Sequence, residues 1–131
     1  ELRPPVEHMQ LFREYARFDI NLAPLERGNP FCEAKSQLKY FEPALVEIPT
    51  AASATVPFAH AISNGETGFL AVTHADWYAV LTFLADNPAE RQRIGKRARV
   101  HARAAFGPEL RRALLVNIMG NVAATHSPAA N

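Results

Sequence analysis

The chain has 131 residues, of which 48% are hydrophobic and 21% charged, and its formal net charge is +1. This length supports one compact domain with a core but not two, and the apolar content excludes a disordered chain. The single cysteine, Cys32, excludes a disulfide scaffold within the chain.

The first 45 residues predict two helices around one strand. Apolar residues recur at a helical spacing over residues 6–17, which predicts an amphipathic helix. Alternating apolar residues predict a short strand over 18–23, and the turn-rich segment 24–33 is expected to be a loop. Ser36 is expected to cap the next helix, in which Pro43 should introduce a kink because it has no backbone N–H.

The rest of the chain alternates short strands with helices. A strand is expected at residues 49–53, a helical turn at 58–63 and another strand at 69–72. Thr73 and Asp76 have the spacing of a capping box, and Asn87-Pro88 is typical of another helix start. That helix should end at Gly107-Pro108, and a last helix should follow and fray from Ala123.

This alternation predicts an α/β fold with a parallel sheet and helices on its faces. We expect one domain over residues 1–131, with an α/β core at 18–86 and C-terminal helices at 87–131. Three strands make a thin sheet with open edges, which is typical of part of something larger. The chain opens on Glu1 with no signal segment, so we expect an intracellular protein or an excised fragment.

The charge is unevenly distributed along the chain. Residues 1–90 carry 6 basic and 12 acidic side chains, a net of −6, whereas residues 91–131 carry 8 basic and 1 acidic, a net of +7. The basic segment is interpreted either as a solvated helix face or as a contact with an anionic surface. Anionic lipid is favoured over nucleic acid, because no aromatic residue alternates with the arginines.

The loop and helix start around residues 29–42 hold the candidate binding residues. A helix start attracts phosphate, and Lys35 and Lys39 lie four residues apart and would add positive charge there. Glu42, one turn further, could accept hydrogen bonds from ribose hydroxyls, and Glu33 could face a sugar. The pattern predicts a site for a nucleotide diphosphate sugar, although an ordinary salt-bridged helix start would look the same.

Two motifs in this order resemble a known enzyme family. The run NPFCEAKSQLKYFEPALVEIPTAAS (residues 29–53) and the run ISNGETGFLA (62–71) are similar to the donor segment of group 1 (family 4) GT-B glycosyltransferases. The resemblance covers about residues 18–106. It implies a partial Rossmann-like sheet from the C-terminal half of such an enzyme. It also implies retaining transfer of a sugar from a nucleotide-sugar, without a metal or another cofactor.

The resemblance assigns roles to five residues. Glu42 matches the second glutamate of the family's paired motif and is implied to bind the donor ribose. Glu33 is the candidate for the first glutamate and thus the candidate catalytic residue, although eight residues separate the two here and the family usually has seven. Lys35 and Ser36 match the segment that meets the diphosphate, and Lys39 belongs to a lysine-rich variant of it. Pro43 and Glu47 depart from the family's pattern.

The implied partners are a nucleotide-sugar donor and a missing N-terminal acceptor domain, without which we expect this chain not to turn over. We further expect a cytoplasmic role in polysaccharide biosynthesis, with residues 91–112 touching the inner membrane surface, and no nucleic acid. Two alternatives stay open. One is a non-catalytic module that binds a nucleotide or a partner, and the other is a nucleic-acid-binding domain that uses residues 91–112.

Overall fold

The computed structural model describes residues 4–7 and 10–125, with side chains described as far as Asn121. Its centre is a parallel sheet of three strands in the order β1 (Asn21–Ala23), β2 (Thr50–Ser53) and β3 (Phe69–Ala71). Asn21 pairs with Thr50 and Ala51 with Phe69. The predicted α/β fold class with a partial Rossmann-like sheet is therefore confirmed.

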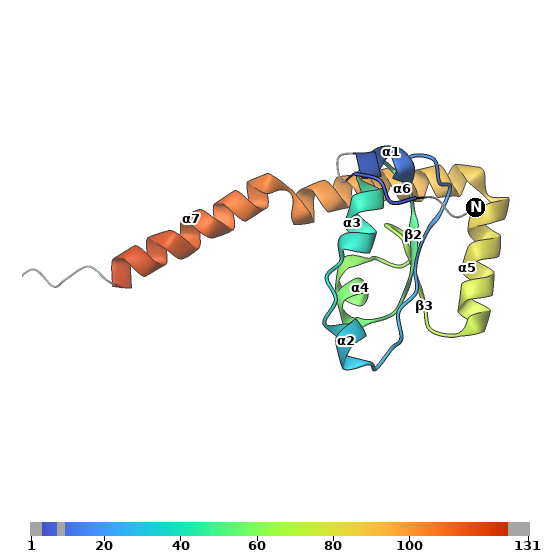
Figure 1. Cartoon of the computed structure of the whole chain (residues 1–131), viewed down its shortest axis with the longest axis horizontal. Coiled ribbons are helices and arrows are strands. Elements are labelled where there is room, and N and C mark those ends of the chain that lie inside the picture. Colours follow the sequence, from blue (N-terminus) through green and yellow to red (C-terminus); the bar gives the residue numbers. More distant parts are fainter. Residues whose placement is uncertain (1–3, 8–9, 126–131) are drawn as a thin grey trace, which may run out of the picture.

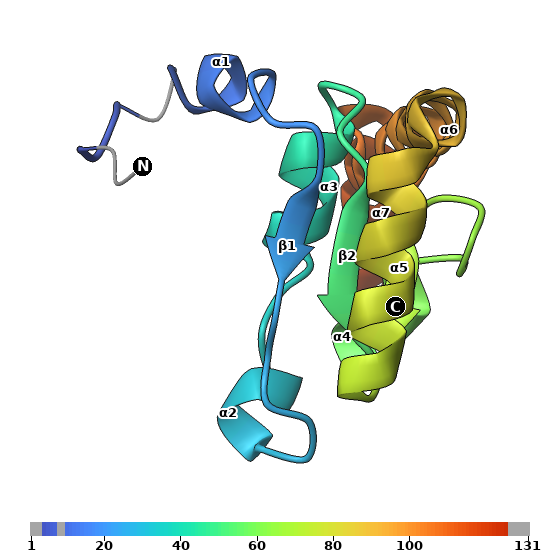
Figure 2. The same cartoon turned by 90° about the vertical axis from the view of Figure 1, so that its right-hand side faces the viewer.

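The helices cover both faces of the sheet and one of its ends. They are α1 (Leu11–Tyr15), α2 (Pro30–Glu33), α3 (Leu38–Ala44), α4 (Val56–Ala61), α5 (His74–Asp86), α6 (Pro88–Phe106) and α7 (Pro108–Thr125). Figures 1 and 2 show α3 and α5 on opposite faces, α6 across the amino ends of the strands, and α7 extending away from the body. The carboxyl ends of the strands lie at the opposite end, near α2 and α4.

Small residues in β2 bring the helices close to the sheet. All four residues of β2 are buried, and none is larger than threonine. Around the strand lies a core in which Tyr40 and Phe58 are the largest side chains. The Tyr40 hydroxyl lies 2.9 Å from His101 Nδ1, and this bond satisfies a polar group that is fully buried. Burial raises the pKa of Tyr40.

Pro43 docks α3 onto the sheet. Because proline has no N–H, the carbonyl of Lys39 four residues earlier loses its helical partner. The side chain of Asn21 fills that place, since its Nδ2 donates to the Lys39 carbonyl at 2.7 Å and to Thr50 Oγ1 at 3.1 Å. One amide therefore joins β1, β2 and α3, and the proline that departs from the family's pattern has a structural role here.

Glu47 ends the α3 segment in a left-handed conformation, with φ of 65°. Its N–H donates to the Ala44 carbonyl, which is the role a glycine commonly has after a helix. The Glu47 carbonyl packs against Gly95 of α6 so closely that a Cβ on Gly95 would lie 1.9 Å from it. Arg99, one turn along α6, pairs with the Glu47 carboxylate at 2.9 Å. Thus α6 holds the corner between α3 and β2.

Several boundaries differ from the prediction. The first helix spans only Leu11–Tyr15, while residues 8–9 of the predicted helix lie outside the described residues. The first strand begins at Asn21 rather than 18, because pairing with β2 starts only at Thr50. The predicted loop contains helix α2, which Asn29 caps by accepting from the Phe31 N–H. The N-cap of α3 is Gln37 and not Ser36.

Helices α5 and α6 begin where the sequence predicts. Thr73 and Asp76 form the predicted capping box of α5. Pro88 stands at the start of α6, but Asn87 makes no side-chain cap there. Its amide instead donates to the Phe83 carbonyl at the end of α5. The division into a core at 18–86 and helices at 87–131 stays a prediction, although α6 contributes Ala98 and Ala102 to the core cluster.

Candidate functional site

Three predicted site residues line one cleft beside the carboxyl ends of the strands. Lys35, Ser36 and Lys39 surround a cleft of about 310 Å³ together with the apolar side chains Leu25, Leu38 and Phe58. Leu25 follows β1 and Phe58 belongs to α4, which follows β2. Ligands of open α/β sheets bind outside this end of the strands, so the position favours a binding site.

Two lysines at or just before the start of α3 line this cleft. Gln37, the N-cap residue, makes no side-chain hydrogen bond to the first turn. Ser36 precedes this N-cap residue and lines the cleft. Lys35 Nζ lies 3.8 Å from the centre of the exposed Phe31 ring. Within the described part of the chain, no carboxylate forms an ion pair with Lys35 or Lys39.

Glu42 lies on the same helix but outside the cleft lining. Its side chain is half-buried, and its Oε2 accepts a hydrogen bond from the Tyr15 hydroxyl at 3.1 Å. Burial, and after it the charge of Glu42, raises the pKa of Tyr15. Helix α1 thus holds the Glu42 carboxylate in place. Its predicted ribose contact stays a prediction.

Glu33 occupies a different position from the other four residues. One carboxylate oxygen accepts from the Gly28 N–H at 3.0 Å and the other from the Val56 N–H at 2.7 Å. These two backbone donors, with a smaller contribution from the charge of Arg27, hold the pKa of Glu33 below its usual value. The carboxylate therefore joins the loop after β1 to the start of α4. Its predicted catalytic role stays a prediction.

A second cleft at the same edge was missed by the sequence analysis. It has about 420 Å³ and is lined by Leu25, Arg27, Ser53, Val72, Thr73, His74 and Trp77. These residues stand at or after the ends of all three strands, which is the signal that could have found them. Ser53 Oγ accepts from the Leu25 N–H at 2.9 Å, and Arg27 Nε donates to the Ala54 carbonyl.

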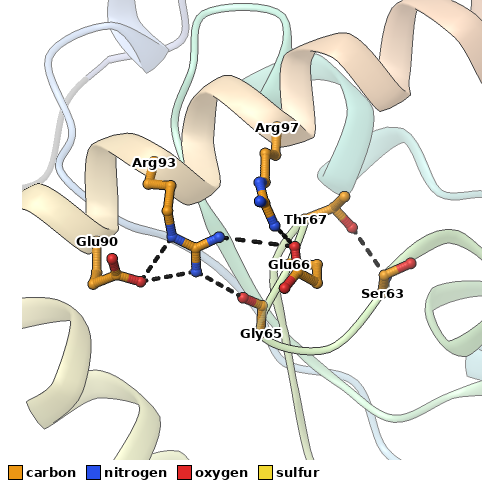
Figure 3. A network of polar contacts seen from close by, with 7 residues as sticks. All are labelled: Ser63, Gly65, Glu66, Thr67, Glu90, Arg93 and Arg97. Carbon is orange, nitrogen blue, oxygen red and sulfur yellow. Dashed lines mark hydrogen bonds and ion pairs between the residues drawn. The ribbon is translucent and has the colours of Figure 1, made fainter.

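The glycine-containing turn 64–68 lies at the other end of the sheet, before β3. Figure 3 shows that α6 holds it there through arginines. Arg93 donates to the Gly65 carbonyl at 3.2 Å and pairs with Glu66 and Glu90, and Arg97 also pairs with Glu66. This position, at the amino end of β3, separates the turn from the candidate cleft and gives it a structural role.

Half of the basic segment is paired within the fold. Arg91 pairs with Asp19 and donates to the Leu84 carbonyl. Arg93 and Arg97 pair with Glu66 of the turn 64–68, and Arg93 also pairs with Glu90 of α6. Arg99 pairs with Glu47, which follows α3. Much of the charge asymmetry of the sequence is therefore neutralised internally. Contact of residues 91–112 with an anionic membrane stays a prediction.

The described residues contain no group of three His, Cys, Asp or Glu side chains that could hold a metal ion. Among their helices, none combines the length and the apolar character needed to cross a membrane.

Comparison with known proteins places the chain in a family. A search of curated protein sequences found no match to it. A family model described as glycosyl transferase-like matches residues 1–117, which is most of the chain and includes the candidate cleft. The match agrees with the resemblance to group 1 GT-B glycosyltransferases that the two motifs show. The chain therefore belongs to the glycosyl transferase-like family.

Proposed function

We propose that this chain is the donor-binding part of a retaining glycosyltransferase that moves a sugar from a nucleotide-sugar to a glycan or lipid-linked acceptor. The observation that supports this best is the cleft in which Lys35, Ser36 and Lys39 meet at the carboxyl side of the sheet. Family membership supports the transferase class. The resemblance of the motifs supports the retaining mechanism and the nucleotide-sugar donor.

The cleft suits a diphosphate leaving group. Cleavage of a glycosyl–phosphate bond leaves negative charge on the diphosphate, and fixed positive groups stabilise that charge in the transition state. Two lysines and a serine line the cleft together with the apolar side chains of Leu25 and Phe58. Apolar walls lower the local dielectric constant, which strengthens the attraction between lysine and phosphate.

The two glutamates complete the proposal. Glu42 would bind the ribose hydroxyls from the helix that also carries Lys39, and its bond to Tyr15 fixes the carboxylate before the donor arrives. Glu33 would face the donor sugar, where a carboxylate can orient hydroxyls or stabilise a developing cation. The two backbone donors that lower its pKa also favour the ionised form that this role needs.

A thermal-shift panel tests the diphosphate site. The wild-type chain is melted with UDP, GDP, ADP or TDP and with inorganic pyrophosphate. A ligand at one hundred times its Kd should stabilise the fold by about 2.7 kcal/mol. Lys35→Met with Lys39→Met should remove the shift, whereas Lys96→Met, a lysine on α6 outside this cleft, should retain it. Equal loss in all variants, or no shift with any ligand, would refute the site.

The ribose contact has its own test. Glu42→Gln should weaken the binding of a nucleoside diphosphate by about tenfold or more, because a charged hydrogen bond contributes about 1.5–3 kcal/mol. Binding of inorganic pyrophosphate, which has no ribose, should be unchanged or slightly tighter. Tyr15→Phe, which keeps the carboxylate but removes the hydrogen bond that fixes it, should weaken nucleoside diphosphate binding less than Glu42→Gln does. Equal weakening of both ligands by Glu42→Gln would contradict the assigned role.

A further inference from the structure

Phe31 is exposed but held in a fixed position. Its side chain is 70% exposed, so most of the ring faces solvent. Its backbone N–H donates to Asn29 Oδ1 at 3.0 Å, and Asn29 in turn donates to Glu26. At the other end of α2, Glu33 bonds to the N–H groups of Gly28 and Val56. The ring therefore stands on a short helix that is fastened at both ends.

The Phe31 ring is the contact that holds the Lys35 ammonium. Nζ of Lys35 lies 3.8 Å from the ring centre, which is a cation–π distance, while the lysine also lines the candidate cleft. A carboxylate partner would neutralise the lysine and compete with an anionic ligand. An aromatic ring instead limits the freedom of the side chain and leaves its full positive charge available.

We infer that Phe31 is a positioning residue that holds the Lys35 ammonium ready for the diphosphate of the donor. This inference rests on the proposed donor site. Lysine is a flexible chain that loses rotamer freedom when it binds a ligand. A ring that restricts the lysine beforehand reduces this loss, which is how preorganisation raises affinity.

A double-mutant cycle tests the inference, with inorganic pyrophosphate as the probe and titration calorimetry as the measurement. Phe31→Leu should weaken binding about two- to fivefold, the range expected for an exposed cation–π contact. Phe31→Tyr should restore wild-type affinity because it keeps an aromatic face. Phe31→Leu should have no further effect once Lys35→Met is present. Phe18→Leu, at a half-exposed phenylalanine before β1, is the matched control.

A second measurement reports on the contact without any ligand. The ε-methylene protons of Lys35 should be shifted upfield by the ring in the wild-type chain, and Phe31→Leu should remove that shift while the melting temperature shows the chain folded. If Phe31→Leu binds pyrophosphate as wild type does while Lys35→Met does not, the inference is wrong and the donor site stands. Weakening by Phe31→Leu that persists beside Lys35→Met also overturns it. Absence of binding by the wild-type chain refutes both.

Discussion

Replacement of Gly95 by alanine should destabilise the protein, although alanine is the better helix former. An exposed glycine in a helix costs about 1 kcal/mol relative to alanine, so the change would ordinarily stabilise α6. At this position, however, the new Cβ would lie 1.9 Å from the Glu47 carbonyl oxygen, where real contacts stay above 3.0 Å. The helix and the α3 corner must therefore separate by at least about 1.1 Å.

The expected loss follows from these two opposing effects. Overpacking of a close contact costs about 1–3 kcal/mol, and a clash with a backbone carbonyl belongs at the upper end because no side-chain rotation relieves it. Subtracting the helical gain of about 1 kcal/mol leaves a net loss of about 2 kcal/mol. The separation should also strain the Arg99–Glu47 ion pair, which spans the same corner.

Urea unfolding followed by circular dichroism measures this change as a lower midpoint with an unchanged slope. Gly120→Ala is the matched control, since Gly120 also lies in a helix but a Cβ there would meet nothing within 4 Å. That variant should be neutral or more stable. If Gly95→Ala raised the midpoint as Gly120→Ala does, the close approach of α6 to Glu47 would be refuted.

Three further predictions concern polar contacts. Glu33→Gln should make the melting temperature depend less on pH in the acid range, because the native pKa of Glu33 is lowered. The stabilisation from the Glu33 carboxylate is present above its ordinary pKa of 4.5 and is lost as the pH falls through the native pKa. The melting temperatures of the wild-type chain and the variant should therefore converge in acid. Glu47→Gly should raise the free energy of unfolding in urea by about 0.5–1 kcal/mol, since glycine adopts the left-handed backbone at φ 65° without strain and the change loses only a surface ion pair. A lower free energy of unfolding would refute the backbone strain at Glu47. Glu66→Gln should cost less than about 1 kcal/mol and lose its effect in high salt, whereas a salt-independent loss would contradict pairing with Arg93 and Arg97.

The helix starts were predictable where the signal is local. Thr73 and Asp76 form a capping box within four residues, and Pro88 opens α6, so neither start needs the rest of the chain to decide it. The pair Asn29-Pro30 carries the same kind of signal and does begin a helix, but this helix is only one turn long and lies within a segment rich in turn residues. Local sequence signals therefore predicted where helices begin better than how long they are.

The candidate site was predictable where it depends on one helix and not where it joins separate segments. Lys35, Ser36 and Lys39 share the cleft because they stand around one helix start. The contact of Glu33 with the Val56 N–H spans 23 residues, and backbone donors leave no pattern in the sequence. The hydrogen bond from the Asn21 side chain to the Lys39 carbonyl, which replaces the helical N–H that Pro43 lacks, could not be predicted for the same reason.

The place of α6 in chain order has a consequence for biosynthesis. Ile94, Ala98 and Ala102 are buried against elements that the ribosome makes earlier, and the arginines beside them pair with acidic groups already synthesised. Until this stretch emerges, the nascent chain carries uncovered apolar surface and uncompensated negative charge. Native structure should therefore form late in translation, and a ribosome stalled before Phe106 should present a protease-sensitive polypeptide.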